Sequence, residues 1–279
     1  MKLYAGIDIG STTGKAALLD AEQNLLGTCI IPATERPEKT ARLCLDQLLD
    51  SLDLDMLQIA FVTGTGYGRV RIPFANDNVS EITCHATGAK WLCPTIKTVI
   101  DIGGQDCKVM AVLPNGRVSD FAMNDKCAAG TGRFMDGQAR AMGVRIDEFS
   151  DLSQAATAPA RVSAQCSVFA ESEVIALING GTEVSDIVAG IHESIASRLV
   201  GLLKRIESLP DVTVTGGCAK NKGLISSLQD MSGLSIVQLQ GDPQTVGAIG
   251  AAVLAHEQAG LASKGTARLL AVPSGANAI

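Results

Sequence analysis

The chain has 279 residues, of which 46% are hydrophobic and 19% charged, and its formal net charge at pH 7 is −6. This composition excludes a disordered chain and is sufficient for two domains with substantial cores. The acidic balance, without a Lys/Arg run, gives no electrostatic footprint for nucleic acid. Charges interrupt the longer apolar runs, and Asp8 falls where a signal peptide keeps its apolar core. We therefore expect a cytoplasmic protein that binds neither nucleic acid nor a membrane.

The first predicted element is a strand over residues 3–8, which runs into the glycine loop GIDIGSTTGK and an apolar return strand over residues 16–19. A similar hairpin, VIDIGGQDCKV, occurs 93 residues later, where Asp101, Gly103 and Lys108 fall on Asp8, Gly10 and Lys15. A strand ending in DxG is common, but two hairpins with matching lysines and return strands predict duplicated domains that face a shared nucleotide. Neither loop is a Walker A or a GxGxxG motif.

A helix over residues 38–52, a strand over 59–63 and the turn Gly64-Thr65-Gly66 follow the first hairpin. Residues 80–93 read as a helix ended by Pro94, which we take as the boundary of a first domain over 1–94. His85 lies on this helix one turn after Glu81, as in a ligand pair or a proton shuttle. A lone histidine on such a helix is more often packed or hydrogen-bonded, so no role is assigned to it.

The second glycine loop opens a segment that ends in a cysteine. Gly103 and Gly104 allow the backbone to turn sharply and approach a phosphate closely. Strands are expected over 108–113 and 117–123, and Cys127 then precedes AAGTG and a helix to residue 142. Its sulfur is expected near a helix N-terminus, where a thiolate is favoured. Cys166 precedes a helix over 168–178 in the same way.

The rest of the second half gives a third glycine loop. Residues 150–159 read as a surface connection, and residues 185–206 as a long amphipathic helix. A strand over 211–215 runs into Gly216-Gly217, and a further strand is expected over 234–239. The expected divisions are a second domain over 95–242, a C-terminal helix over 243–260 packing back on the first domain, and a loose tail over 261–279.

The eight cysteines are expected to be reduced thiols, and no CxxC motif occurs. Six of them read as packing residues: Cys29, Cys44, Cys84, Cys93, Cys107 and Cys218. Cys127 and Cys166 differ because both precede helix starts and small residues that leave room for an inorganic core. They are therefore the candidate metal-binding thiolates of the chain.

Six strings carry a family resemblance across residues 3–255: GIDIGSTTGK, VIDIGGQDCKV, NGRVSDFAMNDKCAAGTGRF, SAQCSVFAESEVIALI, VTGGCAKN and DPQTVGAIGAA. The glycine loops resemble the two phosphate motifs and the adenosine motif of the superfamily that joins acetate kinase, the heat-shock chaperone ATPases and actin. Within it, the chain resembles the 2-hydroxyacyl-CoA dehydratase activators of the BadF/BadG/BcrA/BcrD ATPase family. The implied fold is α/β and actin-like, with two duplicated ribonuclease H-like domains and a nucleotide cleft between them.

The resemblance also implies a site. Asp8 and Asp101 would hold Mg²⁺ or its waters, and Cys127 and Cys166 would bind one [4Fe–4S] cluster between the two subunits of a homodimer. The stoichiometry agrees, because a cubane needs four thiolates and each chain offers two. The residues expected around the ATP or ADP phosphates are Gly10, Ser11, Thr12, Thr13, Lys15, Gly103, Gly104 and Gln105. Those expected around the adenosine are Gly216, Gly217, Lys220 and Asn221. We favour Gln105 for orienting the attacking water, beside Asp8 and Asp101 as catalytic residues.

Three function classes remain open. The first, implied by the resemblance, is an ATPase that passes single electrons from ferredoxin or flavodoxin to a 2-hydroxyacyl-CoA dehydratase-like partner, or to a benzoyl-CoA reductase-like or other cluster-bearing reductase. The second is a small-molecule kinase of the same fold, for which no extra substrate motif is found. The third is a regulatory ATPase without a cluster, which the cysteine pair disfavours.

Overall fold

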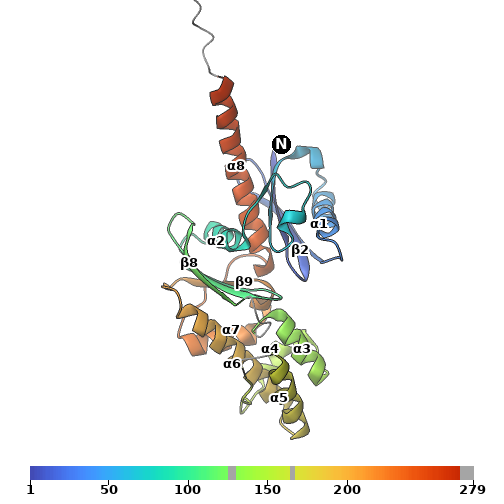
Figure 1. Cartoon of the computed structure of the whole chain (residues 1–279), viewed down its shortest axis with the longest axis vertical. Coiled ribbons are helices and arrows are strands. Elements are labelled where there is room, and N and C mark those ends of the chain that lie inside the picture. Colours follow the sequence, from blue (N-terminus) through green and yellow to red (C-terminus); the bar gives the residue numbers. More distant parts are fainter. Residues whose placement is uncertain (125–129, 164–166, 271–279) are drawn as a thin grey trace, which may run out of the picture.

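The computed structural model describes residues 1–124, 130–163 and 167–270, with the backbone alone at 167–168 and 262–270. Two mixed β-sheets, each covered by helices, lie one beyond the other along the longest axis of the molecule (Figure 1). The central strand of each sheet carries one of the two repeated aspartates, so the sequence repeat corresponds to a repeat in structure.

The first sheet has the strand order β3-β2-β1-β4-β5. Its strands are β1 (Leu3–Ile9), β2 (Thr13–Leu19), β3 (Leu25–Pro32), β4 (Ile59–Thr65) and β5 (Asp77–Asn78). β1 pairs antiparallel with β2 and parallel with β4, which places Lys15 and Thr65 on either side of Asp8. Helix α1 (Pro37–Ser51) buries Cys44, Leu45 and Leu48 in the core formed with these strands. Asp8 therefore stands at the carboxyl end of a fully buried strand.

The second sheet has the order β8-β7-β6-β9 and repeats this register. Its strands are β6 (Thr98–Ile102), β7 (Cys107–Val112), β8 (Val118–Asn124) and β9 (Val212–Thr215). Lys108 and Thr215 lie on either side of Asp101, as Lys15 and Thr65 do around Asp8. The two hairpins are therefore equivalent in pairing as well as in sequence.

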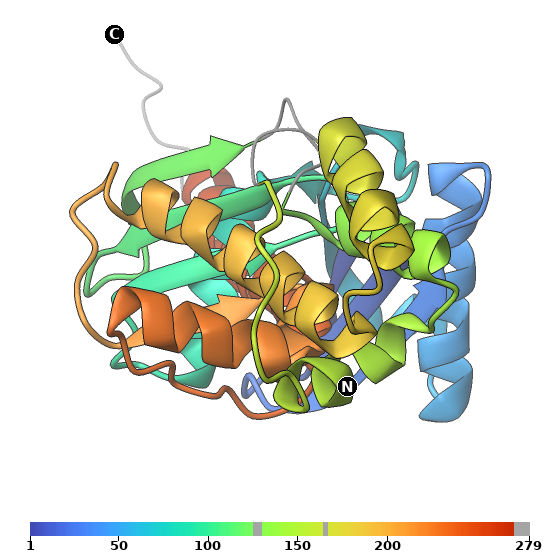
Figure 2. The same cartoon turned by 90° about the horizontal axis from the view of Figure 1, so that it is seen from below.

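Helices of the second half bury the apolar face of this sheet. They are α3 (Gly132–Met142), α4 (Phe149–Gln154), α5 (Ser167–Asn179), α6 (Val184–Leu203) and α7 (Lys222–Ser232). Figure 2 shows α6 and α7 lying side by side across the strands, while α5 projects at one side. Isoleucines 187, 191 and 195 form the buried stripe of α6, which is the amphipathic helix expected from the sequence.

Helices α2 (Glu81–Leu92) and α8 (Val246–Leu270) cross between the two sheets. Their backbones approach so closely that a Cβ on Gly88 would fall against the Val246 carbonyl, and one on Gly250 against the Cys84 carbonyl. α8 packs Ala248 and Ala252 against the first sheet. α2 packs Ala86 and Ala89 against Val99 and Met110 of the second. The two helices thus connect the halves.

The structure differs from two expectations about this half. Residues 150–154 of the expected surface connection belong to α4, whose Phe149 is completely buried in the second core, while residues 155–159 are without helix and mostly exposed. The strand expected over 234–239 is reduced to one bridge between Ile236 and Val212. The backbone of α8 continues to residue 270, into the segment expected as a loose tail, and residues 271–279 lie outside the described part. No helix in the described residues is long and apolar enough to cross a membrane.

Candidate functional site

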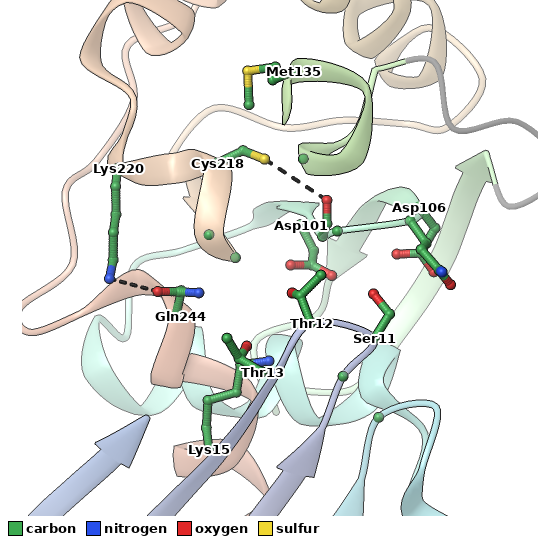
Figure 3. Close-up of a pocket in the computed structure, with 18 of the residues that line it drawn as sticks. Ser11, Thr12, Thr13, Lys15, Asp101, Asp106, Met135, Cys218, Lys220 and Gln244 are labelled. Carbon is green, nitrogen blue, oxygen red and sulfur yellow. Dashed lines mark hydrogen bonds between the residues drawn. The ribbon is translucent and has the colours of Figure 1, made fainter. Parts of the chain in front are cut away.

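A cleft of about 520 Å³ lies between the two halves, at the ends of the central strands (Figure 3). It is lined by every residue expected to bind nucleotide or Mg²⁺: Asp8, Gly10, Ser11, Thr12, Thr13, Lys15, Asp101, Gly103, Gly104, Gln105, Gly216, Gly217, Lys220 and Asn221. Three loops that are distant in sequence therefore meet in one cavity. The expected cluster ligands, Cys127 and Cys166, lie outside the described residues.

The first loop presents a cation to the cleft. Lys15 Nζ lies 3.1 Å from Asp8 Oδ2, and a Cβ added to Gly10 would stand 3.0 Å from the same ammonium. The loop also reaches the second half, since a Cβ on Gly104 would stand 3.0 Å from Ser11 Oγ. The hydroxyls of this loop and the Lys15 ammonium suit a phosphate chain, because they supply hydrogen-bond donors and positive charge at a glycine turn.

The second aspartate is held ionised by its neighbours. Asp101 is 5% exposed; its Oδ1 accepts a hydrogen bond from Thr215 Oγ1 at 3.3 Å, and Lys108 Nζ lies 3.8 Å from its Oδ2. Burial alone would raise the pKa of Asp101. The nearby His85, Lys108 and Lys15 side chains and the Thr215 hydroxyl outweigh that effect and lower this pKa below its ordinary value. The carboxylate form needed by a divalent cation is therefore the one present at neutral pH.

A buried network beside the second loop was not expected from the sequence. Asp106 Oδ2 accepts from Lys108 Nζ at 2.6 Å and from the Tyr67 hydroxyl at 2.6 Å. Burial and this hydrogen bond raise the pKa of Tyr67 to about 12, so the phenol keeps its proton. Because Tyr67 follows β4 and Asp106 precedes β7, the bond joins the two halves across the cleft.

Equivalent glycines close the two strand ends next to the aspartates. Gly66 follows β4 with φ of 81°, and Gly216 follows β9 with φ of 88°, a conformation that favours glycine. A Cβ on Gly216 would stand 2.7 Å from Asp101 Oδ1, and one on Gly66 would collide with Asp8 Oδ1. The turn at Gly66 was noted in the sequence, but its place in the site was not.

Two of the residues expected to border adenosine make bonds within the protein. Lys220 Nζ lies 2.7 Å from Gln244 Oε1 (Figure 3), and it also lies 2.5 Å from Asp242 Oδ2. Asn221 Oδ1 caps α7 by accepting from Leu224 N, and Asn221 Nδ2 donates to His192 Nε2 at 3.0 Å. These bonds fix the third loop. Sequence reasoning missed further residues that line the cleft, among them Met135, Asp136, Ile146, Asp147 and Ser150.

The second loop is bonded directly to the start of α3. Gly132 N donates to Gly103 O, and Arg133 N donates to Gly104 O, each at 3.0 Å. The oxygen and nitrogen of the Gln105 amide are assigned in the orientation that allows hydrogen bonds to Arg133. In this orientation, Gln105 Oε1 accepts from Arg133 Nη1 at 2.7 Å. Because Arg133 occupies the Gln105 oxygen, a water in the cleft would contact the Gln105 amino group. The oxygen would become available to water only if Arg133 moved away. The loop and the helix are mechanically connected.

The donor set of the cleft fits Mg²⁺ rather than an all-protein metal site. Among the described residues, there is no group of three or more His, Cys, Asp or Glu side chains that could hold a metal ion. Mg²⁺ commonly uses one or two carboxylates and completes its octahedron with water and substrate phosphates. Asp8 and Asp101, both 5% exposed at the cavity wall, provide such a pair of carboxylates.

His85 is a further cleft residue, although no role was assigned to it from the sequence. It is 5% exposed, and its Nδ1 lies 2.9 Å from Thr215 Oγ1 and 3.6 Å from Asp101 Oδ1. The one-turn spacing from Glu81 was the only local signal for it. Its partners come from β6 and β9, which no helical pattern could have indicated.

Comparison with known proteins identifies the architecture. The model of the BadF/BadG/BcrA/BcrD ATPase family matches residues 5–255. The (R)-2-hydroxyglutaryl-CoA dehydratase activating ATPase of Acidaminococcus fermentans is 40% identical over 93% of this chain and 99% of its own length. A component chain of the benzoyl-CoA reductase of Thauera aromatica is 33% identical over 91% of this chain and 93% of its own.

A solved structure agrees over the whole fold. It is the activator of the 2-hydroxyisocaproyl-CoA dehydratase from Clostridium difficile with bound ADPNP, at 36% identity and a TM-score of 0.88, and the match covers 99% of this chain and 100% of that one. The predicted actin-like ATPase fold is thereby confirmed. The chain belongs to the BadF/BadG/BcrA/BcrD ATPase family and is an ATPase.

Proposed function

We propose that this ATPase is the activator, and one-electron donor, of a 2-hydroxyacyl-CoA dehydratase-type enzyme, with a [4Fe–4S] cluster bridging a homodimer. The observation that carries the proposal is the bonding of the second phosphate loop to the first residues of α3. α3 begins five residues after Cys127, so the loop that would contact the phosphates is bonded to the helix that follows a proposed cluster ligand. The names of its relatives support the choice of partner.

The state of the other cysteines supports Cys127 and Cys166 as the ligands. Burial raises the pKa of Cys107 to about 11 and that of Cys84 and Cys218 to about 12, and it also raises the pKa of Cys44. These thiols stay protonated at neutral pH, whereas an iron–sulfur cluster is held by thiolates. Cys93, partly exposed, donates to or accepts from the Thr95 hydroxyl.

The surface of α5 supports a homodimer. Phe169 and Ile175 on this helix are 67% and 45% exposed, and α5 lies at the end of the molecule far from the first sheet (Figure 1). Since one chain offers two proposed thiolates and a cubane needs four, the partner we infer for these exposed apolar side chains is a second copy of the chain. The two Cys166 segments, each directly before α5, would then meet at the dimer axis.

The residues of the chain have defined tasks in this scheme. Asp8 and Asp101 would hold Mg²⁺ or its waters; the loops around Ser11 and Gly104 would bind the phosphates; and Gln105 would orient water when ATP is split to ADP and phosphate. The cluster, when bound, would take one electron from reduced ferredoxin or flavodoxin and pass it to the dehydratase. Movement of the second loop on hydrolysis would shift α3 through the Gly103 and Gly104 bonds.

A benzoyl-CoA reductase-type partner is the second candidate, because a 33% identical relative is part of such an enzyme. With such a partner, this chain would use the same cleft and the same cluster, and only the electron acceptor would differ. Assays of the reduced, ATP-supplied protein with a 2-hydroxyacyl-CoA dehydratase component and with an aromatic acyl-CoA reductase component distinguish the two.

The test of the proposal is anaerobic iron and sulfide analysis, with EPR of the dithionite-reduced protein in the presence and absence of MgATP. We expect about four irons per dimer, as a single cubane requires. Cys127→Ser and Cys166→Ser should lose the iron, and the matched controls Cys93→Ser and Cys218→Ser should retain it. A colourless dimer that still hydrolyses ATP after anaerobic reconstitution would contradict the proposal and favour a regulatory ATPase.

A further inference from the structure

His85 occupies a position between the two repeated aspartates. It comes from α2, the helix that packs between the sheets, and its side chain is 7% exposed in the wall of the cleft. The first half contributes Asp8 and the second half Asp101 and Thr215 around it. The two ring nitrogens therefore face different halves of the molecule: Nδ1 faces the second half and Nε2 faces the first.

The Nδ1 side is fixed by a hydrogen-bond relay. Thr215 has one hydroxyl hydrogen, which it donates to Asp101 Oδ1 at 3.3 Å. The 2.9 Å contact between His85 Nδ1 and Thr215 Oγ1 therefore has the histidine as donor, which assigns the proton to Nδ1. Since Lys108 lies 3.8 Å from Oδ2, the two Asp101 oxygens are each held from a different side. Rotation of this carboxylate is restricted.

The Nε2 side faces the first half across Gly247. A Cβ added to Gly247 would stand 2.8 Å from His85 Nε2 and 3.3 Å from Asp8 Oδ2, so both atoms border the same small space. Glycine at this position of α8 is what allows the imidazole to lie between the halves. No residue with a Cβ could occupy it without displacing the ring.

We propose that His85 is a positioning residue for the metal end of the nucleotide. Through Nδ1 and Thr215, it fixes the orientation of Asp101 so that the two carboxylates can share one hydrated cation. This inference rests on ATP hydrolysis in the cleft and is independent of the cluster. Groups that orient a metal-binding side chain commonly contribute about 10–100-fold to metal affinity or activity.

The test uses substitutions that copy one ring nitrogen at a time. The amide nitrogen of His85→Asn lies near the position of Nδ1, whereas that of His85→Gln reaches toward Nε2; His85→Ala removes both. The first measurement is the dissociation constant of Mn²⁺ in the presence of ADP, from the EPR signal of free Mn²⁺. The second is kcat and KM for MgATP, and iron content and thermal unfolding are measured alongside.

We expect His85→Ala and His85→Gln to weaken Mn²⁺ binding and lower kcat by about 10–100-fold, and His85→Asn to stay within about threefold of the unsubstituted protein. Thr215→Val should reproduce the loss, and the double variant with His85→Ala should lose nothing more, because both act through one relay. Equal behaviour of the Asn and Gln variants, or losses that multiply, would overturn the inference.

Asp101→Asn separates this outcome from failure of the site itself. Asp101→Asn should abolish Mn²⁺ binding in the cleft, whether or not His85 has a positioning role. If Asp101→Asn abolishes binding and the His85 variants bind Mn²⁺ normally, only the positioning role is wrong. If Asp101→Asn binds Mn²⁺ and hydrolyses ATP normally, the nucleotide site has been misplaced.

Discussion

The two hairpins share a backbone register, but their lysines do different things. In the first, Lys15 is 12% exposed by side chain and points its ammonium at the glycine turn, with Asp8 as its ion-pair partner. In the second, Lys108 is 2% exposed and is surrounded by Asp106 at 2.6 Å and by Asp101 and Glu81 at 3.8 Å. The repeat therefore kept the position of the lysine while changing its environment from a ligand-facing surface to a buried network.

The loops differ in the same sense. A Cβ at Gly10 would meet the Lys15 ammonium, whereas a Cβ at the equivalent Gly103 would stand 3.0 Å from a carboxylate oxygen of Asp106. The first turn therefore has a positive charge beside its glycine, and the second has a carboxylate there. At the second turn, Asp106 is neutralised by Lys108 and hydrogen-bonded by Tyr67, and backbone bonds lead on to α3. In the proposed scheme both turns would contact the phosphates, and the second, through its backbone bonds, would also shift α3.

The largest expected effect separates the two lysines. Lys108→Met removes the cation that lies beside the buried carboxylates of Asp106 and Asp101, whereas Glu81 keeps Arg69 at 3.0 Å. Breaking such a buried pair costs about 3–5 kcal/mol of unfolding free energy. Lys15→Met should cost less unfolding free energy, because Lys15 has one carboxylate partner where Lys108 has three carboxylates within 4 Å, but it should weaken ADP binding about tenfold. Denaturant unfolding and calorimetric titration measure the two quantities. Equal destabilisation by both variants would mean that the halves have not diverged.

The aspartates are the positions at which the halves should remain equivalent. Asp8→Asn and Asp101→Asn keep shape but remove the charge that a divalent cation needs, so each should lower kcat for ATP hydrolysis by about 10²–10³-fold. Phosphate release at saturating MgATP is the measurement, and unchanged iron content is the control for folding. A variant that hydrolyses MgATP at the unsubstituted rate would remove that aspartate from the site.

Acid should destabilise the second half through His192. Burial lowers the pKa of His192 to about 4, and the ring accepts a hydrogen bond from Asn221. Between about pH 6.5 and 4, the unfolded chain binds a proton that the folded chain does not, so stability is complete above this window and falls as pH falls through it. The loss from pH 7.5 to 5 should be about 2 kcal/mol.

His192→Gln tests this assignment, because its side-chain oxygen can still accept from Asn221 but does not titrate. Denaturant midpoints at the two pH values should lie closer together in this variant. The matched control is His256→Gln on α8, which removes a histidine outside the second core. If the control reduces the acid loss as much as His192→Gln does, the loss does not arise in the second half.

The sequence was sufficient for what is local and repeated. The constant offset of 93 residues found both hairpins, and paired glycines after a strand found the loop at Gly216. The place of Gly66 in the site was not predicted, because Gly66 lies 150 positions from its equivalent, Gly216, and the offset of the hairpins does not align the two. The roles of Asp106 and His85 were not predicted for another reason. Their partners, Tyr67 and Thr215, lie on other elements, and only the folded chain brings them together.

The smallest expected effect concerns the bond that joins the halves. Tyr67→Phe removes the hydrogen bond to Asp106. It keeps the aromatic ring, whose centroid lies 5.9 Å from Lys108 Nζ. Because Tyr67 is 53% exposed, the loss should be only about 1 kcal/mol. Since the nucleotide must leave between the halves, that loss should appear as an ADP release rate about fivefold faster, in stopped flow with a fluorescent ADP analogue. The chemical step should be unchanged in single turnover, because Asp106 keeps Lys108. A slower chemical step with unchanged ADP release would instead place Tyr67 at the phosphates and make the bond part of the site rather than a restraint on its opening.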